Sequence, residues 1–99
     1  MYSVQQFVAE VNDLGTNVTS FVLFLHNSCD SEFAKYRLRL FQMQVTGLRH
    51  RQSKLKPLVD PSETQDYYLA TSDLSRIKDK VDMAVKRLKR ETTKGAVSW

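Results

Sequence analysis

The side chains best suited to chemistry in this sequence are two histidines and one cysteine. His26 and Cys29 lie three positions apart, so a helix would place them on one face. Imidazole and thiolate are ligands that zinc prefers, but His50 is distant in the sequence and Cys29 has no CxxC companion. Because two candidate ligands make a weak metal site, we expect structural roles for these residues and no bound metal.

Patterns that mark catalysis or nucleotide binding are absent from the sequence. It contains no glycine-rich phosphate loop and no Gly-x-Ser-x-Gly nucleophile elbow. Most acidic residues fall at expected helix starts or at solvent-facing positions, where capping and solvation explain them. The sequence therefore predicts a protein that is not an enzyme, carries no cofactor and takes no small-molecule substrate.

Three stretches of the chain carry apolar residues at alternating steps of three and four positions, the spacing of a heptad repeat. This spacing keeps one stripe of each helix facing a partner along its whole length, as in a coiled coil. The sequence therefore predicts an all-α fold, an antiparallel bundle of three long helices. The three stripes are Val4, Phe7, Val11, Leu14, Val18, Phe21, Leu25; Ala34, Leu38, Phe41, Val45, Leu48, Leu55, Val59; and Tyr67, Ala70, Leu74, Ile77, Val81, Ala84, Leu88.

Capping and turn residues set the expected helix limits within a single domain that covers the whole chain. Ser3 can cap the first helix, because Gln6 three positions later can reciprocate. Asp60 and Pro61 offer a cap and a first helical residue for the third helix. We expect helices over about residues 3–28, 32–56 and 61–92, a frayed tail over residues 93–99, and either a kink or a close contact at Gly15.

Charge is sorted along the chain. Residues 1–34 contain four acids and no lysine or arginine, whereas residues 35–59 contain seven bases and no acid. Part of this pattern has a structural explanation, because Asp66 and Asp73 of the third helix are predicted to flank the seam with the basic second helix. That pairing would neutralise charge near the second turn.

Near the opposite end of the predicted bundle the bases outnumber the acids. Such a patch could bind anionic lipid or nucleic acid, and a solvated basic surface explains it equally well. No recognisable nucleic-acid-binding motif accompanies it. The candidate anion-binding residues are Lys35, Arg37, Arg39, Lys86, Arg87, Lys89 and Arg90.

A second apolar stripe follows three-four spacing on the predicted second helix, on the side away from the first stripe. A three-helix bundle buries one stripe per helix, so these residues would remain exposed, and an exposed apolar patch usually marks an interface. We interpret the stripe as a contact surface for a protein partner, for self-association or for a further helix; the alternative is a central second helix sandwiched by the other two. The candidate interface residues are Phe33, Tyr36, Leu40 and Met43 of the second helix, joined by Leu23 and Phe24 of the first.

One segment of the second helix resembles a known family. Its core reads Glu32-Phe33-x-x-Tyr36-x-Leu38-Arg39-Leu40, followed by Gln44-Val45. This pattern is similar to the second-helix region of HeLo-type domains, helical bundles at the N-terminus of fungal cell-death and prion-associated proteins. The resemblance implies a module that is held quiet, then oligomerises and attacks membranes through its N-terminal helix. The chain carries His50-Arg51 where that family tends to have Trp-Gly.

Cysteine content and hydropathy bear on the compartment. With one cysteine the chain can form no internal disulfide, which favours a reducing compartment. No basic region precedes an apolar stretch at the N-terminus, and the densest apolar run, residues 21–25, is too short to span a bilayer. We therefore expect an intracellular protein, in the cytoplasm.

Overall fold

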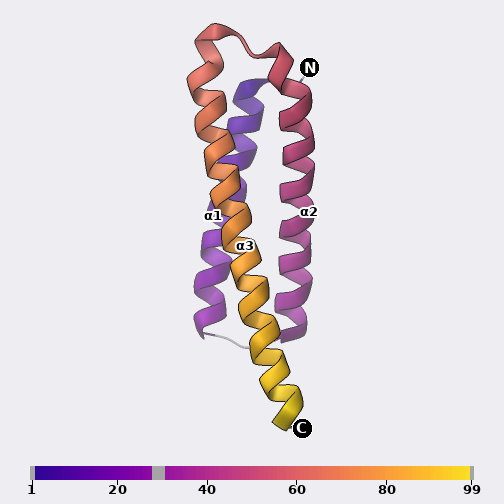
Figure 1. The fold of residues 1–99 in the computed structure, drawn as a ribbon. Coiled ribbons are helices and arrows are strands. Elements are labelled where there is room, and N and C mark those ends of the chain that lie inside the picture. The colour runs from indigo at the N-terminus through magenta and orange to yellow at the C-terminus, as the bar shows by residue number, and fades with distance from the viewer. Residues whose placement is uncertain (1, 28–30, 99) are drawn as a thin grey trace.

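The computed structural model describes the backbone of residues 2–27 and 31–98 and the side chains of residues 2–25 and 32–89. Three long helices lie side by side: α1 (Val4–Asn27), α2 (Ser31–Leu55) and α3 (Thr64–Ser98) (Figure 1). Two short 3-10 turns, η1 (Lys56–Leu58) and η2 (Pro61–Glu63), connect α2 to α3. The chain alternates direction from helix to helix, which confirms the predicted all-α bundle.

The core runs along the axis where the three helices meet. Every described residue that is buried belongs to one of the three predicted stripes, and none of them is charged. Leu25, Val59, Ala84 and Leu88, which complete the stripes, are partly buried against this core. Burial of apolar surface is therefore the main source of stability of this core. The buried residues are Val4, Phe7, Val11, Leu14, Val18, Phe21, Ala34, Leu38, Phe41, Val45, Leu48, Leu55, Tyr67, Ala70, Leu74, Ile77 and Val81.

A polar residue, Gln52, interrupts the apolar stripe on α2, and Tyr67 of α3 lies beside it. The phenol of Tyr67 donates a hydrogen bond of 3.2 Å to the backbone carbonyl of Gln52. Tyr67 is 3% exposed, so its hydroxyl needs a partner inside the protein. The bond satisfies that hydroxyl and ties the end of α2 to the start of α3.

The start of α1 is capped as the sequence predicts. The backbone N–H of Ser3 donates to Oε1 of Gln6 at 2.9 Å, and the N–H of Gln6 donates to Oγ of Ser3 at 3.2 Å. Two N–H groups that the helix leaves unpaired thus find acceptors in neighbouring side chains. The capping box predicted from these two residues is confirmed.

The start of α3 differs from the prediction. Asp60 was expected to cap a helix beginning at Pro61, but Pro61–Glu63 form η2, and the side chain of Asp60 makes no capping hydrogen bond. Its backbone carbonyl instead accepts bonds from the N–H of Glu63 at 2.9 Å and from Oγ1 of Thr64 at 3.2 Å. The tighter 3-10 turn satisfies the chain locally, so α3 begins three residues later.

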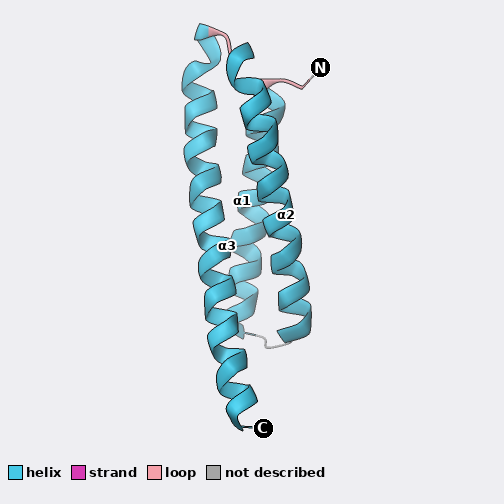
Figure 2. Cartoon of the chain, turned by 45° about the vertical axis from the view of Figure 1, so that its right-hand side comes forward, coloured by secondary structure: helices cyan, strands magenta, loops and turns pink. Residues whose placement is uncertain are grey.

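The end of α3 also differs, because the helix continues to Ser98 and the expected frayed tail is helical. No proline interrupts this segment, and its glycine imposes only a modest cost. At 1.5 Å per residue, the 35 residues of α3 run about 15 Å longer than the 25 of α2. The end of α3 accordingly extends beyond the end of α1 and the start of α2 (Figure 2).

Gly15 marks a close contact between helices. A Cβ atom at this position would lie 3.2 Å from Cδ1 of Ile77 on α3, which is tighter than ordinary van der Waals contact. Of the two roles predicted for this glycine, the structure thus gives it a role in close packing. Gly47, in contrast, has nothing within 4 Å of its Cβ direction, and both glycines have ordinary helical dihedrals.

This contrast predicts opposite outcomes for one substitution at two sites. We expect Gly47→Ala to raise the free energy of unfolding by about 0.5–1 kcal/mol, because alanine restricts the unfolded chain and fills open space. Gly15→Ala should gain less or lose stability, because Ile77 must shift. Urea denaturation followed by far-UV circular dichroism measures both values, and equal gains at the two sites would contradict the contact at Gly15.

Candidate protein-interaction surface

A cluster of aromatic rings joins the end of α1 to the start of α2. Phe21 and Phe41 are buried in the core, and their ring centroids lie 5.5 Å apart. Phe33 lies 6.3 Å from Phe21 and 6.3 Å from Phe24, and both outer rings are 45% exposed. The cluster therefore passes continuously from the core to the surface.

The second stripe of α2 extends this cluster along the outside of the bundle. Tyr36 is 61% exposed and Met43 is 64% exposed, while Leu40 between them is half-buried. Leu38 on the opposite side of the same helix is only 2% exposed. The alternative of an α2 sandwiched between the other helices is therefore wrong. We define the α2 patch as Phe24, Phe33, Tyr36, Leu40 and Met43.

Leu23, the remaining predicted interface residue, is 61% exposed but occupies a different side of α1. Consecutive residues of a helix point about 100° apart, so Leu23 and Phe24 do not share one face. The ring contact to Phe33 places Phe24 on the side of α2. Leu23 therefore does not directly continue the α2 patch.

Two arginines of α2 reach toward α1, and the first of them, Arg37, borders the patch. The guanidinium of Arg37 lies 4.9 Å from the ring centroid of Phe41 and 5.9 Å from that of Phe21, within the range of cation–π attraction. Arg51 forms a 2.7 Å ion pair with Glu10 of α1. Both arginines thereby reach toward α1 along the edge of α2.

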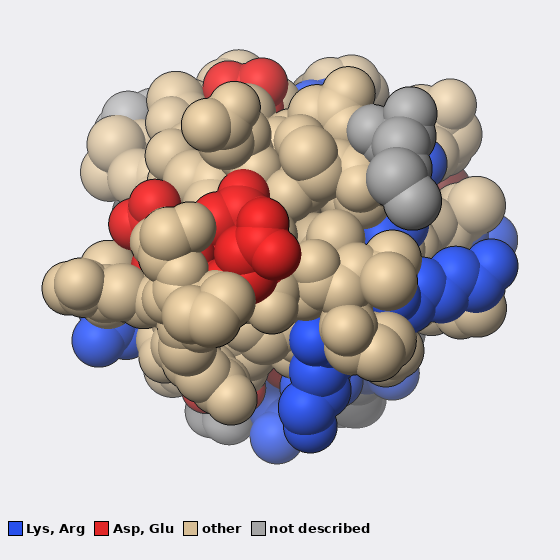
Figure 3. All heavy atoms as spheres, turned by 90° about the horizontal axis from the view of Figure 1, so that it is seen from above, with Lys and Arg blue, Asp and Glu red and all other residues tan. Residues whose placement is uncertain are grey.

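Other bases of α2 are exposed and carry no ion pair to any acid that the structure describes. They are Lys35, Arg39, Arg49 and Lys54. Seen from the end that carries the α2–α3 connection, an acidic cluster and most of the visible bases lie on different sides of the molecule (Figure 3). At this end of the molecule, acidic and basic side chains are therefore separated on the surface.

The predicted anion-binding residues come from two helices at one end of the bundle. Lys35 and Arg39 are exposed near the start of α2, and Lys86, Arg87 and Lys89 are exposed near the end of α3. These segments lie at the same end of the bundle, where α1 ends and α2 begins (Figure 1). Arg37 differs from the others because it lies over two phenylalanine rings, and the side chain of Arg90 lies outside the described residues.

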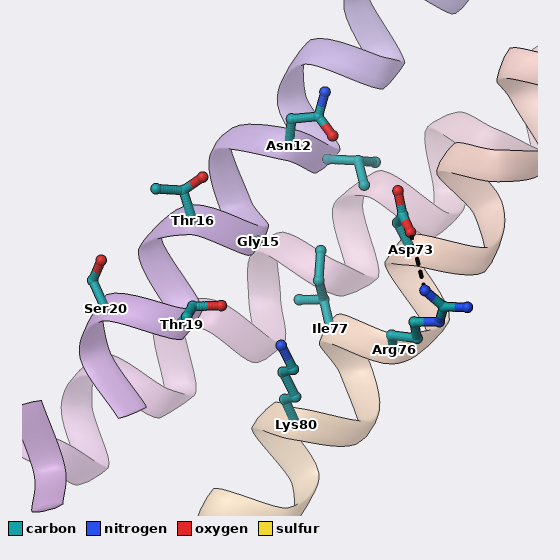
Figure 4. Close-up of a pocket in the computed structure, with 10 residues that line it drawn as sticks. Asn12, Gly15, Thr16, Thr19, Ser20, Asp73, Arg76, Ile77 and Lys80 are labelled. Atoms are coloured by element: carbon teal, nitrogen blue, oxygen red, sulfur yellow. Dashed lines mark ion pairs between the residues drawn. The ribbon is translucent and has the colours of Figure 1, made fainter. Parts of the chain in front are cut away.

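The predicted neutralisation of α2 by α3 is wrong. Within the described part of the chain, neither Asp66 nor Asp73 pairs with a base of α2. Oδ1 of Asp73 instead lies 3.9 Å from Nη1 of Arg76, one turn along α3. The reason is the rotation of α3, which turns Asp73 toward a groove beside α1 (Figure 4).

That groove, between α1 and α3, has a volume of about 480 Å³. Gly15 and Ile77 lie at the bottom of it, and polar side chains line its sides. Lys80 projects toward it from α3, and the hydroxyls of Thr16, Thr19 and Ser20 come from α1, with Asn12 one turn earlier (Figure 4). The groove contains one ion pair and no histidine or cysteine, so it offers no combination of groups typical of catalysis.

Metal ligands and membrane spans can be assessed only where the chain is described. Within that part, no three histidine, cysteine, aspartate or glutamate side chains converge as a metal site would require. The side chains of His26 and Cys29, the sequence's candidate ligand pair, lie outside it. None of the described helices has the length and apolar character to cross a membrane.

Comparison with protein-family models, with curated proteins and with solved structures finds no match to this chain. The class that the structure itself defines is an all-α bundle of three long helices with an apolar patch on the outside of its second helix.

A polar network that was not predicted from the sequence lies along the α1–α2 seam, at the end opposite the aromatic cluster. Oε2 of Glu10 accepts hydrogen bonds from the hydroxyl of Tyr2 at 3.0 Å and from Nη1 of Arg51 at 2.7 Å. The Arg51 guanidinium also lies 5.6 Å from the centroid of the Tyr2 ring. Partial burial, followed by the hydrogen bond to Glu10 and its negative charge, raises the pKa of Tyr2 to about 12.

This pKa predicts how the network responds to alkali. Because the folded state favours the neutral phenol, its contribution to stability is fully present below pH 10, the ordinary tyrosine value. That contribution is lost as the pH rises toward 12. Absorbance of tyrosinate should show one tyrosine titrating near pH 12 in the wild-type chain, and Tyr2→Phe should remove that step. A titration unchanged by Tyr2→Phe would contradict the network.

Proposed function

We propose that this protein is a non-catalytic interaction or assembly module that binds a protein partner, or another copy of itself, through the α2 patch. The observation that carries the proposal is the continuity of the patch with the core through the Phe21, Phe24 and Phe33 rings. A rigid aromatic anchor that emerges from a packed core is a common centre of binding energy at interfaces.

The free energy that would be gained by burying the patch favours an interface over a chance exposure. Fully burying a large apolar side chain stabilises a complex by about 1.5–3 kcal/mol before the costs of association. Tyr36 and Met43 leave more than half of their side-chain surface in water, and Phe33 nearly half. A partner that covers the patch would remove this apolar surface from water.

The spacing of the patch suits a helical partner. Phe33, Tyr36, Leu40, Met43 and Gly47 follow the same three-four steps as the buried stripe of α2. A fourth helix could pack along this seam with coiled-coil geometry, which would complete a four-helix bundle. Oligomerisation of the chain itself would use the same seam.

Single substitutions distinguish this role from structural burial. We expect Met43→Asp to weaken association at least tenfold while leaving helicity unchanged, because an interface would have to desolvate the new carboxylate. Leu40→Asp should act in the same direction with some loss of stability, because Leu40 is half-buried. Met83→Asp is the matched control, since Met83 is 70% exposed on α3.

The measurements are solution mass by light scattering across a concentration series and anisotropy of a labelled neutral amphipathic helical peptide of about four heptads. Association by either route that Met43→Asp weakens and Met83→Asp spares supports the proposal. Equal effects of the two substitutions, or no association by either route up to about 1 mM, would count against it.

A second candidate is binding of anionic lipid or nucleic acid through the basic end of the bundle, in an intracellular, cytoplasmic setting. The observation that favours it is the exposure of Lys35, Arg39 and Lys86 at that end. Membrane attack after oligomerisation, as the HeLo-type resemblance implies, is the more specific form of this candidate. Flotation with phosphatidylserine vesicles should then fall steeply with salt and in Lys35→Glu, and leakage of such vesicles would mark the HeLo-type form.

A further inference from the structure

The charges beside the α2 patch specify what kind of partner it binds. Resting on the proposed function, we infer that the occupant of the patch is an acidic amphipathic helix of another protein. Its apolar side chains cover Phe33, Tyr36, Leu40 and Met43, and its carboxylates face the bases on both edges of α2.

Bases lie on both sides of the patch. Arg37 occupies the edge toward α1, as its contact with Phe21 shows. Lys35 and Arg39 lie one position before Tyr36 and Leu40, about 100° around the helix, so they border the opposite edge. An apolar seam with bases at both margins is complementary to a helix that carries acids at its own margins.

The described chain gives no acidic counterpart to Lys35, Arg37 or Arg39. No acid occurs between positions 35 and 59, and the structure gives neither Lys35 nor Arg39 an ion pair among the residues it describes. Each exposed pair with a partner's carboxylate adds only a fraction of a kilocalorie, but several pairs together favour acidic over neutral partners. The charges also select against basic partners.

A second copy of this chain is a poor occupant for the same reason. If two α2 helices packed patch to patch, in either direction, the bases of one copy would face the bases of the other. Glu32, at the first turn, is the sole acid of α2. Like charges brought together at such a seam are destabilising, so the patch favours a different chain.

A membrane surface fits the patch less well than a helix does. A helix that lies in a membrane interface immerses a broad apolar face, but the other stripe of α2 is already buried in the bundle. The patch is instead a narrow row that runs about 15 Å along α2, from Phe33 to Met43, at 1.5 Å per residue. Gly47 lies one turn beyond Met43 with open space in front of its Cα, where a partner backbone can approach closely.

The test uses three labelled peptides of about four heptads each, with leucine at the core positions and glutamate, glutamine or lysine at the flanking positions. At low ionic strength we expect the glutamate peptide to bind at least tenfold more tightly than the glutamine peptide, and the lysine peptide to bind most weakly. The preference should shrink as salt is added, because these charges are exposed.

Charge reversal supplies the decisive comparison. Lys35→Glu/Arg39→Glu should reduce the preference for the glutamate peptide to threefold or less, whereas Lys80→Glu, which changes a charge beside the α1–α3 groove, should leave it intact. Far-UV circular dichroism and urea unfolding of each variant verify that the fold is retained. A wild-type chain that binds all three peptides equally, or binds none of them, would overturn the inference.

The outcomes separate this inference from the proposed function. If the three peptides bind equally and Met43→Asp still weakens their binding, the α2 patch remains an interface. Only the acidic character of the partner is then excluded. Self-association that depends on Met43 would assign the patch to a second copy and overturn the inference. Binding to phosphatidylserine vesicles that depends on Met43, with no peptide bound, would assign it to a membrane and overturn both.

Discussion

Because Leu38, Phe41 and Val45 must face α1 and α3, helical geometry sends Tyr36, Leu40 and Met43 to the opposite side of α2. The burial of the inner stripe thus fixes the rotation of α2, and that rotation determines which side chains meet water. The position of the patch follows from the core, and any change that rotates α2 would affect both faces together.

Phe21 is the residue that connects the core to the α2 patch. It is 7% exposed, contacts Phe41 inside the bundle, and contacts Phe24 and Phe33 toward the surface. Arg37 covers Phe21 and Phe41 from outside, so a charged group that borders the patch is held by the same rings. Apolar anchoring and charge selection therefore arise from one local arrangement at the α1–α2 seam.

The sequence was most informative about features that repeat with the helical turn or that depend on residues close together in the chain. The three stripes predict every buried residue that the structure describes, since burial along a straight helix repeats with the helical turn. The Ser3–Gln6 box was predictable because its partners lie three positions apart. The exposed second stripe of α2 could likewise be read from spacing, because the inner stripe already accounts for one face.

Features that depend on how helices rotate against one another were not predictable from the sequence. The partner of Glu10 proved to be Arg51, 41 positions away, and Asp73 faced the α1–α3 groove instead of α2. The contact of Arg37 with Phe41 had a usable signal, because residues four positions apart are neighbours on a helix. At Asp60, two local structures compete within a few residues, and the 3-10 turn formed where a helix start was expected.

The burial of one face of α2 and the exposure of its other apolar face can be measured without any partner. Methyl NMR spectra recorded with a soluble paramagnetic probe report the solvent exposure of each methyl group. Met83 at 70% exposure and Leu74 at 1% provide internal references. We predict that the Met43 methyl broadens to nearly the same extent as that of Met83. Protection of Met43 comparable to that of Leu74 would contradict the claim, because the outer stripe would then be part of the core.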